Sequence, residues 1–169
     1  MSADLLGEAQ RLLAFPGARH LQNIHPLIVH FPIALLMTAA LMYWLGFLAR
    51  REYWQWAGLW MLVLGAFGAM AAVGTGLYAA PGVMIAPSVK AALLVYHKRI
   101  MISVLILSAA LALWAATARP LPARGRGVFL AMLVLVAALI AEGADYGGRM
   151  VYDYNAGGNA CGQPIEFSQ

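Results

Sequence analysis

The sequence contains little charge. Aspartate, glutamate, lysine and arginine make up 11% of its 169 residues, whereas a soluble globular domain has about 25%. Hydrophobic residues make up 63%. So few charges cannot form the polar surface of a soluble protein, and we predict an integral membrane protein of one domain. The basic residues stand at the ends of apolar segments and not along one face, so we expect no nucleic-acid binding.

Cys161 is the only cysteine, so the chain can form no internal disulfide and has no cysteine pair for a metal. The CxxCH motif, which attaches haem covalently, is absent, so any haem would be non-covalent haem b. Hydrolytic motifs and phosphate-binding glycine loops are absent as well. The first 20 residues contain acids and no apolar core, so we expect no cleaved signal peptide.

Long apolar segments are what the sequence does contain. About 20 such residues cross a bilayer, and we expect membrane helices at residues 26–48, 53–78, 99–118 and 128–145. They predict an all-α fold, a four-helix transmembrane domain over residues 23–154. Residues 1–22 alternate leucines with charged residues and predict a short amphipathic helix at the membrane surface. Residues 155–169 are expected to be an irregular polar tail.

The arginines predict how the helices are oriented. The loops after the first and third segments contain five arginines and one acid: Arg50, Arg51, Arg119, Arg124, Arg126 and Glu52. Arginine and lysine concentrate in short cytoplasmic loops. Four crossings then put both termini on the periplasmic side of a bacterial inner membrane, and all four histidines lie near that side.

The most distinctive stretch is His25-Pro26-Leu27-Ile28-Val29-His30-Phe31-Pro32, at the start of the first apolar segment. Ionisable side chains at a membrane boundary are a functional hypothesis by default. The longer string HPLIVHFPIALL resembles the opening motif of a bacterial family of predicted membrane proteins, domain of unknown function 2231. His97 and the run Gly147-Gly148-Arg149-Met150-Val151-Tyr152 fit the same resemblance, over residues 21–154. Because some members are fused to cytochrome c or Rieske-type domains, the resemblance implies a redox setting.

The histidines predict a cofactor site. In an up-down-up-down bundle the first and third helices run parallel and usually sit diagonally. Histidines at similar depth on these two helices can therefore face one another across the core. A haem with two axial imidazoles needs this arrangement. We expect His97 and either His25 or His30 to bind haem b.

The sequence leaves the second ligand open. His25 matches the depth of His97 better, whereas His30 would place the metal deeper in the bundle. The two residues are separated by about 140° around an ideal helix, so they do not reach one metal from the same direction. The histidine that is not a ligand is a candidate for a hydrogen bond, a propionate contact or a quinone site.

Other residues are expected to support the cofactor. Arg99 and Arg149 lie at the right level to pair with haem propionates. Gly68, Ala72 and Gly76 recur on one face of the second segment, which permits close approach of another helix. The same thin face would admit a flat cofactor, so Gly68 and Gly76 are cofactor-binding candidates.

The leading hypothesis is a membrane redox subunit, not a stand-alone enzyme. It would pass electrons between a periplasmic partner, such as a cytochrome c, and quinone or a larger respiratory-type complex. One alternative is a metal- or quinol-binding protein that uses His25 or His30 with Glu142 or Asp145. Another is a cofactor-free accessory subunit, docked through the Gly68/Ala72/Gly76 face, whose histidines bind only lipid head groups.

Overall fold

The computed structural model describes residues 24–156, and every regular element in that range is helical. The long helices are α2 (His25–Leu48), α3 (Glu52–Ala79), α5 (Val95–Ala118) and α6 (Arg126–Tyr152). Short helical elements between α3 and α5 are η2 (Ala80–Gly82), α4 (Pro87–Val89) and η3 (Lys90–Leu94). The predicted all-α fold is confirmed. The predicted amphipathic helix and nearly all of the polar tail lie outside the described residues.

Four helical stretches are long and apolar enough to cross a membrane. They cover residues 25–48, 52–82, 87–118 and 126–152. Hydroxyl groups within them bond to backbone carbonyls of their own helix, as Thr38 does with Ala34 and Ser103 with Arg99. Such bonds keep polar groups satisfied in hydrocarbon, where no water is present. The chain is a multi-pass membrane protein.

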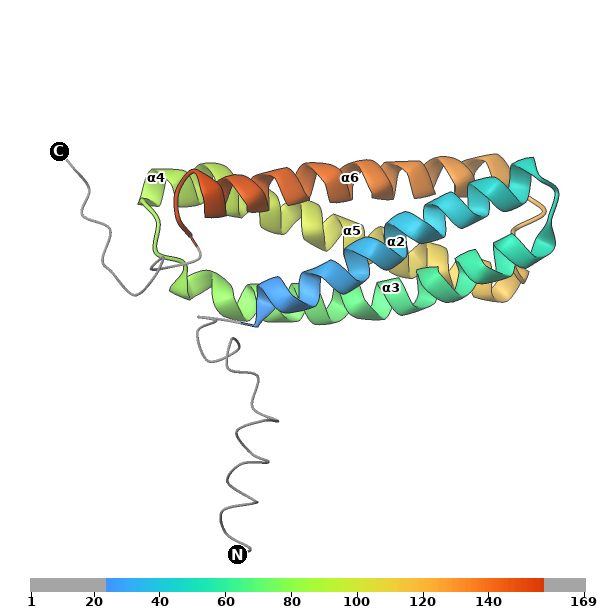
Figure 1. Ribbon diagram of the computed structural model, residues 1–169, viewed down its shortest axis with the longest axis horizontal. Coiled ribbons are helices and arrows are strands. Elements are labelled where there is room, and N and C mark those ends of the chain that lie inside the picture. Colours follow the sequence, from blue (N-terminus) through green and yellow to red (C-terminus); the bar gives the residue numbers. More distant parts are fainter. Residues whose placement is uncertain (1–23, 157–169) are drawn as a thin grey trace, which may run out of the picture.

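The four long helices form an antiparallel bundle (Figure 1). Both α2 and α5 pack against α3 and against α6, so α2 and α5 sit diagonally and run in the same direction. We call the end where these two helices begin the histidine end. The opposite end, which carries the loops at residues 49–51 and 119–125, is called the arginine end.

Two large aromatic side chains fill the core towards the arginine end. Tyr43 and Phe129 are fully buried, and their rings meet edge to face with centroids 5.0 Å apart. The Tyr43 hydroxyl donates a hydrogen bond to the carbonyl oxygen of Pro120 over 3.0 Å. This bond connects the loop between α5 and α6 to α2 and so fixes the position of that loop against the bundle.

The small-residue face of α3 packs against α2. A Cβ added at Gly68 would lie 3.1 Å from Phe31 and 3.2 Å from Pro32, and one at Gly65 would lie 2.7 Å from Leu36. Glycines here therefore allow the close approach of the two helices. The structure contradicts the hypothesis that this face docks onto a larger complex, because α2 of the same chain covers it.

Two helical stretches extend beyond the expected membrane spans. α6 passes through Gly147 and Gly148 and ends at Tyr152, beyond the expected end at residue 145. The third crossing is helical from Pro87, with a π-helical turn at Lys90–Leu94, and not only over residues 99–118. Packing explains both differences, since Leu93 and Met150 are buried in the bundle and tertiary contacts outweigh the low helix propensity of glycine.

Candidate functional site

His25 is held by α3. Its Nδ1 lies 3.2 Å from Oγ1 of Thr75. The Thr75 hydroxyl also has two acceptors in its own helix, the carbonyl oxygens of Ala71 at 2.9 Å and Ala72 at 3.0 Å. With its proton on one of these carbonyls, Thr75 can accept a hydrogen bond from Nδ1 of His25. In the neutral ring with Nδ1 protonated, the lone pair is on Nε2.

Gly76 makes room for the His25 ring. A Cβ at this position would lie 2.8 Å from Cε1 and 3.2 Å from Nδ1 of His25. Real Cβ atoms essentially never approach another heavy atom as closely as 2.8 Å. Only glycine therefore lets the imidazole lie directly against the backbone of α3, next to the threonine that orients it.

His97 is held by α6 in the same manner. Its Nδ1 lies 2.8 Å from the carbonyl oxygen of Gly143. A carbonyl only accepts, so Nδ1 is the protonated nitrogen and Nε2 has the lone pair in the neutral ring. A Cβ at Gly147, one turn further along α6, would lie 3.3 Å from Cε1 of His97. The ring thus lies against a glycine here as well.

The structure brings His25 and His97 together at the histidine end. They stand on the diagonal helices α2 and α5, each within the first residues of its helix. Both rings are partly buried. A histidine that ligates a metal almost always donates its other ring N–H to an acceptor, which fixes the ring orientation. Both imidazoles have that bond.

His30 does not join this pair. Its side chain is exposed on the outside of α2, whereas the neighbouring Pro32 is buried against α3. The five-residue separation from His25 turns the two rings to different sides, as the helix geometry predicts. Of the two sequence candidates for the partner of His97, only His25 is thus turned towards the neighbouring helix of the bundle.

The predicted charged residues stand at the same end. Arg99 and Arg149 have exposed side chains, and Nε of Arg149 lies 3.8 Å from Oδ2 of Asp153. An exposed pair at this distance contributes little to stability, so the guanidinium can exchange its partner. Their pairing with propionates stays a prediction.

The carboxylates do not form a metal cluster with the histidines. Glu142 and Asp145 are exposed. Over residues 24–156, no group of three or more histidine, cysteine, aspartate or glutamate side chains is arranged to hold a metal ion. A zinc or iron site built by protein ligands alone therefore has no support in this part of the chain, whereas haem requires only two.

An irregular turn and an aromatic pair flank His97. The π-helical turn Lys90–Leu94 directly precedes α5, and π-helical turns inside helices are frequent at functional sites. Tyr96 stacks on Tyr146 of α6 with ring centroids 6.1 Å apart and an angle of 20° between the planes. The stacked rings join α5 to α6 next to the hydrogen bond made by His97.

Thr75, Gly143 and Gly147 were not predicted as site residues. Thr75 stands beside Gly76 in a helix face that the sequence marks only as small. Gly143 acts through its backbone carbonyl, for which no side-chain pattern exists. Gly147 belongs to the run after the fourth segment, but its contact with His97 needs the observed extension of α6. Only Thr75 had a signal in the sequence, because it is a polar residue next to a glycine of the small-residue face.

Comparison with known proteins adds the family. A family model described as "Predicted membrane protein (DUF2231)" matches residues 21–160, which includes every residue of the site. Comparison with curated proteins and with solved structures gives no match. The matched range covers far more than half of the chain. The protein therefore belongs to the DUF2231 family of predicted membrane proteins, as the motif at its first membrane helix indicates.

Proposed function

We propose that the protein is a membrane redox subunit that holds haem b at the histidine end, with His25 and His97 as the axial ligands. One observation carries the proposal: two imidazoles on diagonal helices are both fixed through Nδ1 to the neighbouring helix. A histidine that contacts only lipid head groups needs no hydrogen-bond partner within the protein. Here Nδ1 of each ring lies within hydrogen-bond distance of a group on the neighbouring helix, and a glycine of that helix lies at the edge of the ring.

The residues present fit the group. Imidazole is an ordinary axial ligand of haem, and the cores of helix bundles are ordinary cofactor sites. With Nδ1 donating, the lone pair of each neutral ring is on Nε2, the nitrogen that would bind the haem iron. When bound, the haem would supply one-electron chemistry. The chain's part is to hold the two rings in one orientation, which Thr75 and Gly143 do.

The position of the site favours exchange of electrons at the membrane surface. Five arginines in the loops of the other end favour a cytoplasmic location for that end, so the histidine end would face the periplasm. We infer a periplasmic electron-transfer protein, such as a cytochrome c, on one side of the reaction and quinone or a larger membrane complex on the other. His30, exposed on α2 towards lipid, is our candidate for contact with a quinone head group.

Histidine variants test the proposal. Each variant is expressed with haem supply, purified in detergent and assayed for haem per polypeptide. We expect His97→Ala and His25→Ala to lose the haem, and His30→Ala, the matched control on the same helix, to retain it. Equal haem content in all variants, or loss only in His30→Ala, would rule out the pair proposed here.

A further inference from the structure

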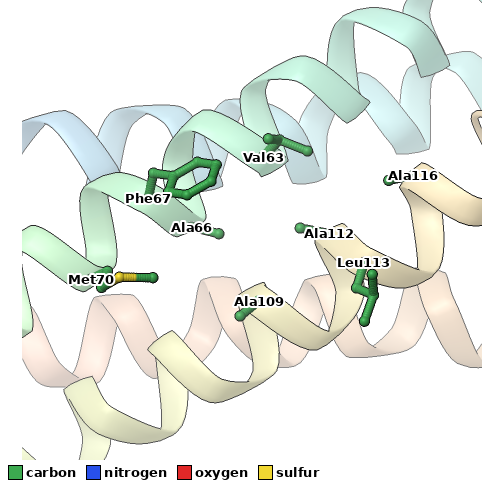
Figure 2. A pocket seen from close by; sticks show the side chains of 8 residues that line it. All are labelled: Val63, Ala66, Phe67, Met70, Ala109, Ala112, Leu113 and Ala116. Carbon is green, nitrogen blue, oxygen red and sulfur yellow. The ribbon is translucent and has the colours of Figure 1, made fainter.

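A lipid-facing groove lies between α3 and α5, far from the histidines (Figure 2). Its volume is about 300 Å³, and its lining is wholly apolar. Four alanines of the two helices line it, of which Ala66 and Ala112 are buried and Ala109 and Ala116 are exposed. Phe67 and Leu113 are on its rim and are 65% and 69% exposed. The groove therefore opens towards the hydrocarbon of the bilayer.

The groove leads to an arginine. In Figure 2, Val63 and Ala116 mark one end of the groove, and Met70 and Ala109 mark the other. α5 ends at Ala118, and the next residue, Arg119, lies three residues beyond Ala116 and is exposed. On α3, Trp60 precedes Val63 by one turn and is 63% exposed. These two side chains do not line the groove, but they follow the same end of it, which we call its mouth.

The charge at this mouth is not balanced by protein. Glu52, the first residue of α3, accepts a hydrogen bond from Nε1 of Trp56 over 3.1 Å. Within residues 24–156, the ion pair Arg149–Asp153 stands at the other end, and none involves the arginines of these loops. Arg126 lies over the ring of Phe47, 6.0 Å from its centroid. Arg119 can therefore pair with an anion from outside the chain.

We propose that the groove binds one anionic phospholipid, with an acyl chain between α3 and α5 and the phosphate at Arg119. The apolar lining fits a hydrocarbon chain and offers no group to a polar ligand. The guanidinium of arginine matches a phosphate through paired hydrogen bonds, and tryptophan is favoured at the level of the head groups. This site is separate from the haem proposal and does not depend on it.

The test uses the whole protein in nanodiscs of equal parts phosphatidylglycerol and phosphatidylcholine with matched acyl chains. Native mass spectrometry after transfer to detergent counts the lipids that remain bound. Arg119→Gln removes the charge, and Arg51→Gln is its control at the same end. Ala109→Phe and Ala116→Phe fill the groove from exposed positions, and Ala110→Phe is an exposed control on α5 that does not line it.

We expect the native chain to retain phosphatidylglycerol over phosphatidylcholine. Arg119→Gln should lower this retention about tenfold, as loss of one charged hydrogen-bond partner does, and both groove-filling variants should abolish it. The two controls should retain the lipid. Equal retention of both lipids, or an equal effect of Arg51→Gln, would overturn the proposal. A change of oligomeric state in Ala116→Phe would overturn it too, because a second copy would then fill the groove.

Discussion

His97 donates a hydrogen bond from Nδ1 to the carbonyl oxygen of Gly143 over 2.8 Å, which joins α5 to α6. The acceptor is a backbone carbonyl of α6, so the hydrogen bond forms only if α5 and α6 approach closely at this point. A Cβ at Gly143 would meet the Met101 methyl group and would lie 3.1 Å from Cγ2 of Ile100. The orientation of a candidate ligand thus rests on the tight packing of a glycine.

This packing predicts a measurable coupling between Gly143 and Met101. Gly143→Ala should lower the free energy of unfolding by about 1–3 kcal/mol, because the new methyl group overpacks the interface. Met101→Ala removes the atoms that it would meet. The double variant should therefore be more stable than the sum of the single effects predicts, by about 1 kcal/mol in a double-mutant cycle. Strict additivity would show that the two side chains do not compete for one space.

The contact between His25 and Gly76 predicts that alanine substitutions at two glycines of α3 have different effects on stability. Gly76→Ala should displace the imidazole and cost about 1–3 kcal/mol of stability. Gly74→Ala is the control, because a Cβ there meets nothing within 4 Å, and it should be neutral or stabilise the helix by about 0.5–1 kcal/mol. Thermal unfolding in detergent compares the two variants. A similar loss of stability in both would contradict the close contact with His25.

Thr75 is predicted to orient His25 and not merely to fill space. Thr75→Val keeps the shape but removes the acceptor, and it should weaken haem binding about 10–100-fold, as loss of such an orienting bond does at metal sites. Thr75→Ser should restore binding. Thr117→Val is the matched control, because Thr117 makes the same bonds to its own helix at the arginine end. If both valine variants bind haem equally, Thr75 has no positioning role.

Much of the fold could be predicted from the sequence. Apolar runs of sufficient length gave the four crossings, and an even number of crossings put the histidines at one end. The diagonal placement of α2 and α5 follows from the usual order of an antiparallel bundle. The extension of α6 could not be predicted, because Gly147 and Gly148 look like a helix end until the contact of Gly147 with His97 of α5 is known.

The choice between His25 and His30 needed the structure. α2 is apolar around its whole circumference, so its sequence pattern does not reveal which side is buried. Its rotation is set instead by the packing of Pro32 and Leu36 against glycines of α3. That rotation turns His25 inward and leaves His30 exposed. The hydrogen-bond acceptor at Gly143 is a backbone carbonyl, so no pattern of side chains in the sequence predicts it.

The loop between α5 and α6 is predicted to depend on one buried hydroxyl. Tyr43→Phe removes the hydrogen bond to Pro120 and leaves that buried carbonyl without its donor, which should cost about 1–3 kcal/mol. Tyr53→Phe is the control, since Tyr53 is 62% exposed and should have little effect. Unfolding midpoints of the two variants, measured in the same detergent, make the comparison. An unchanged midpoint in Tyr43→Phe would mean that the loop is held by other contacts.

The most direct test of haem binding is the absorption spectrum of the native protein, oxidised and then reduced with dithionite, after expression with haem supply. A haem b site with two histidine ligands should give a Soret band and, on reduction, sharp α and β bands. A flat spectrum from well-folded protein isolated with its native partners would contradict it. The paired histidines would then belong to an accessory subunit without a cofactor.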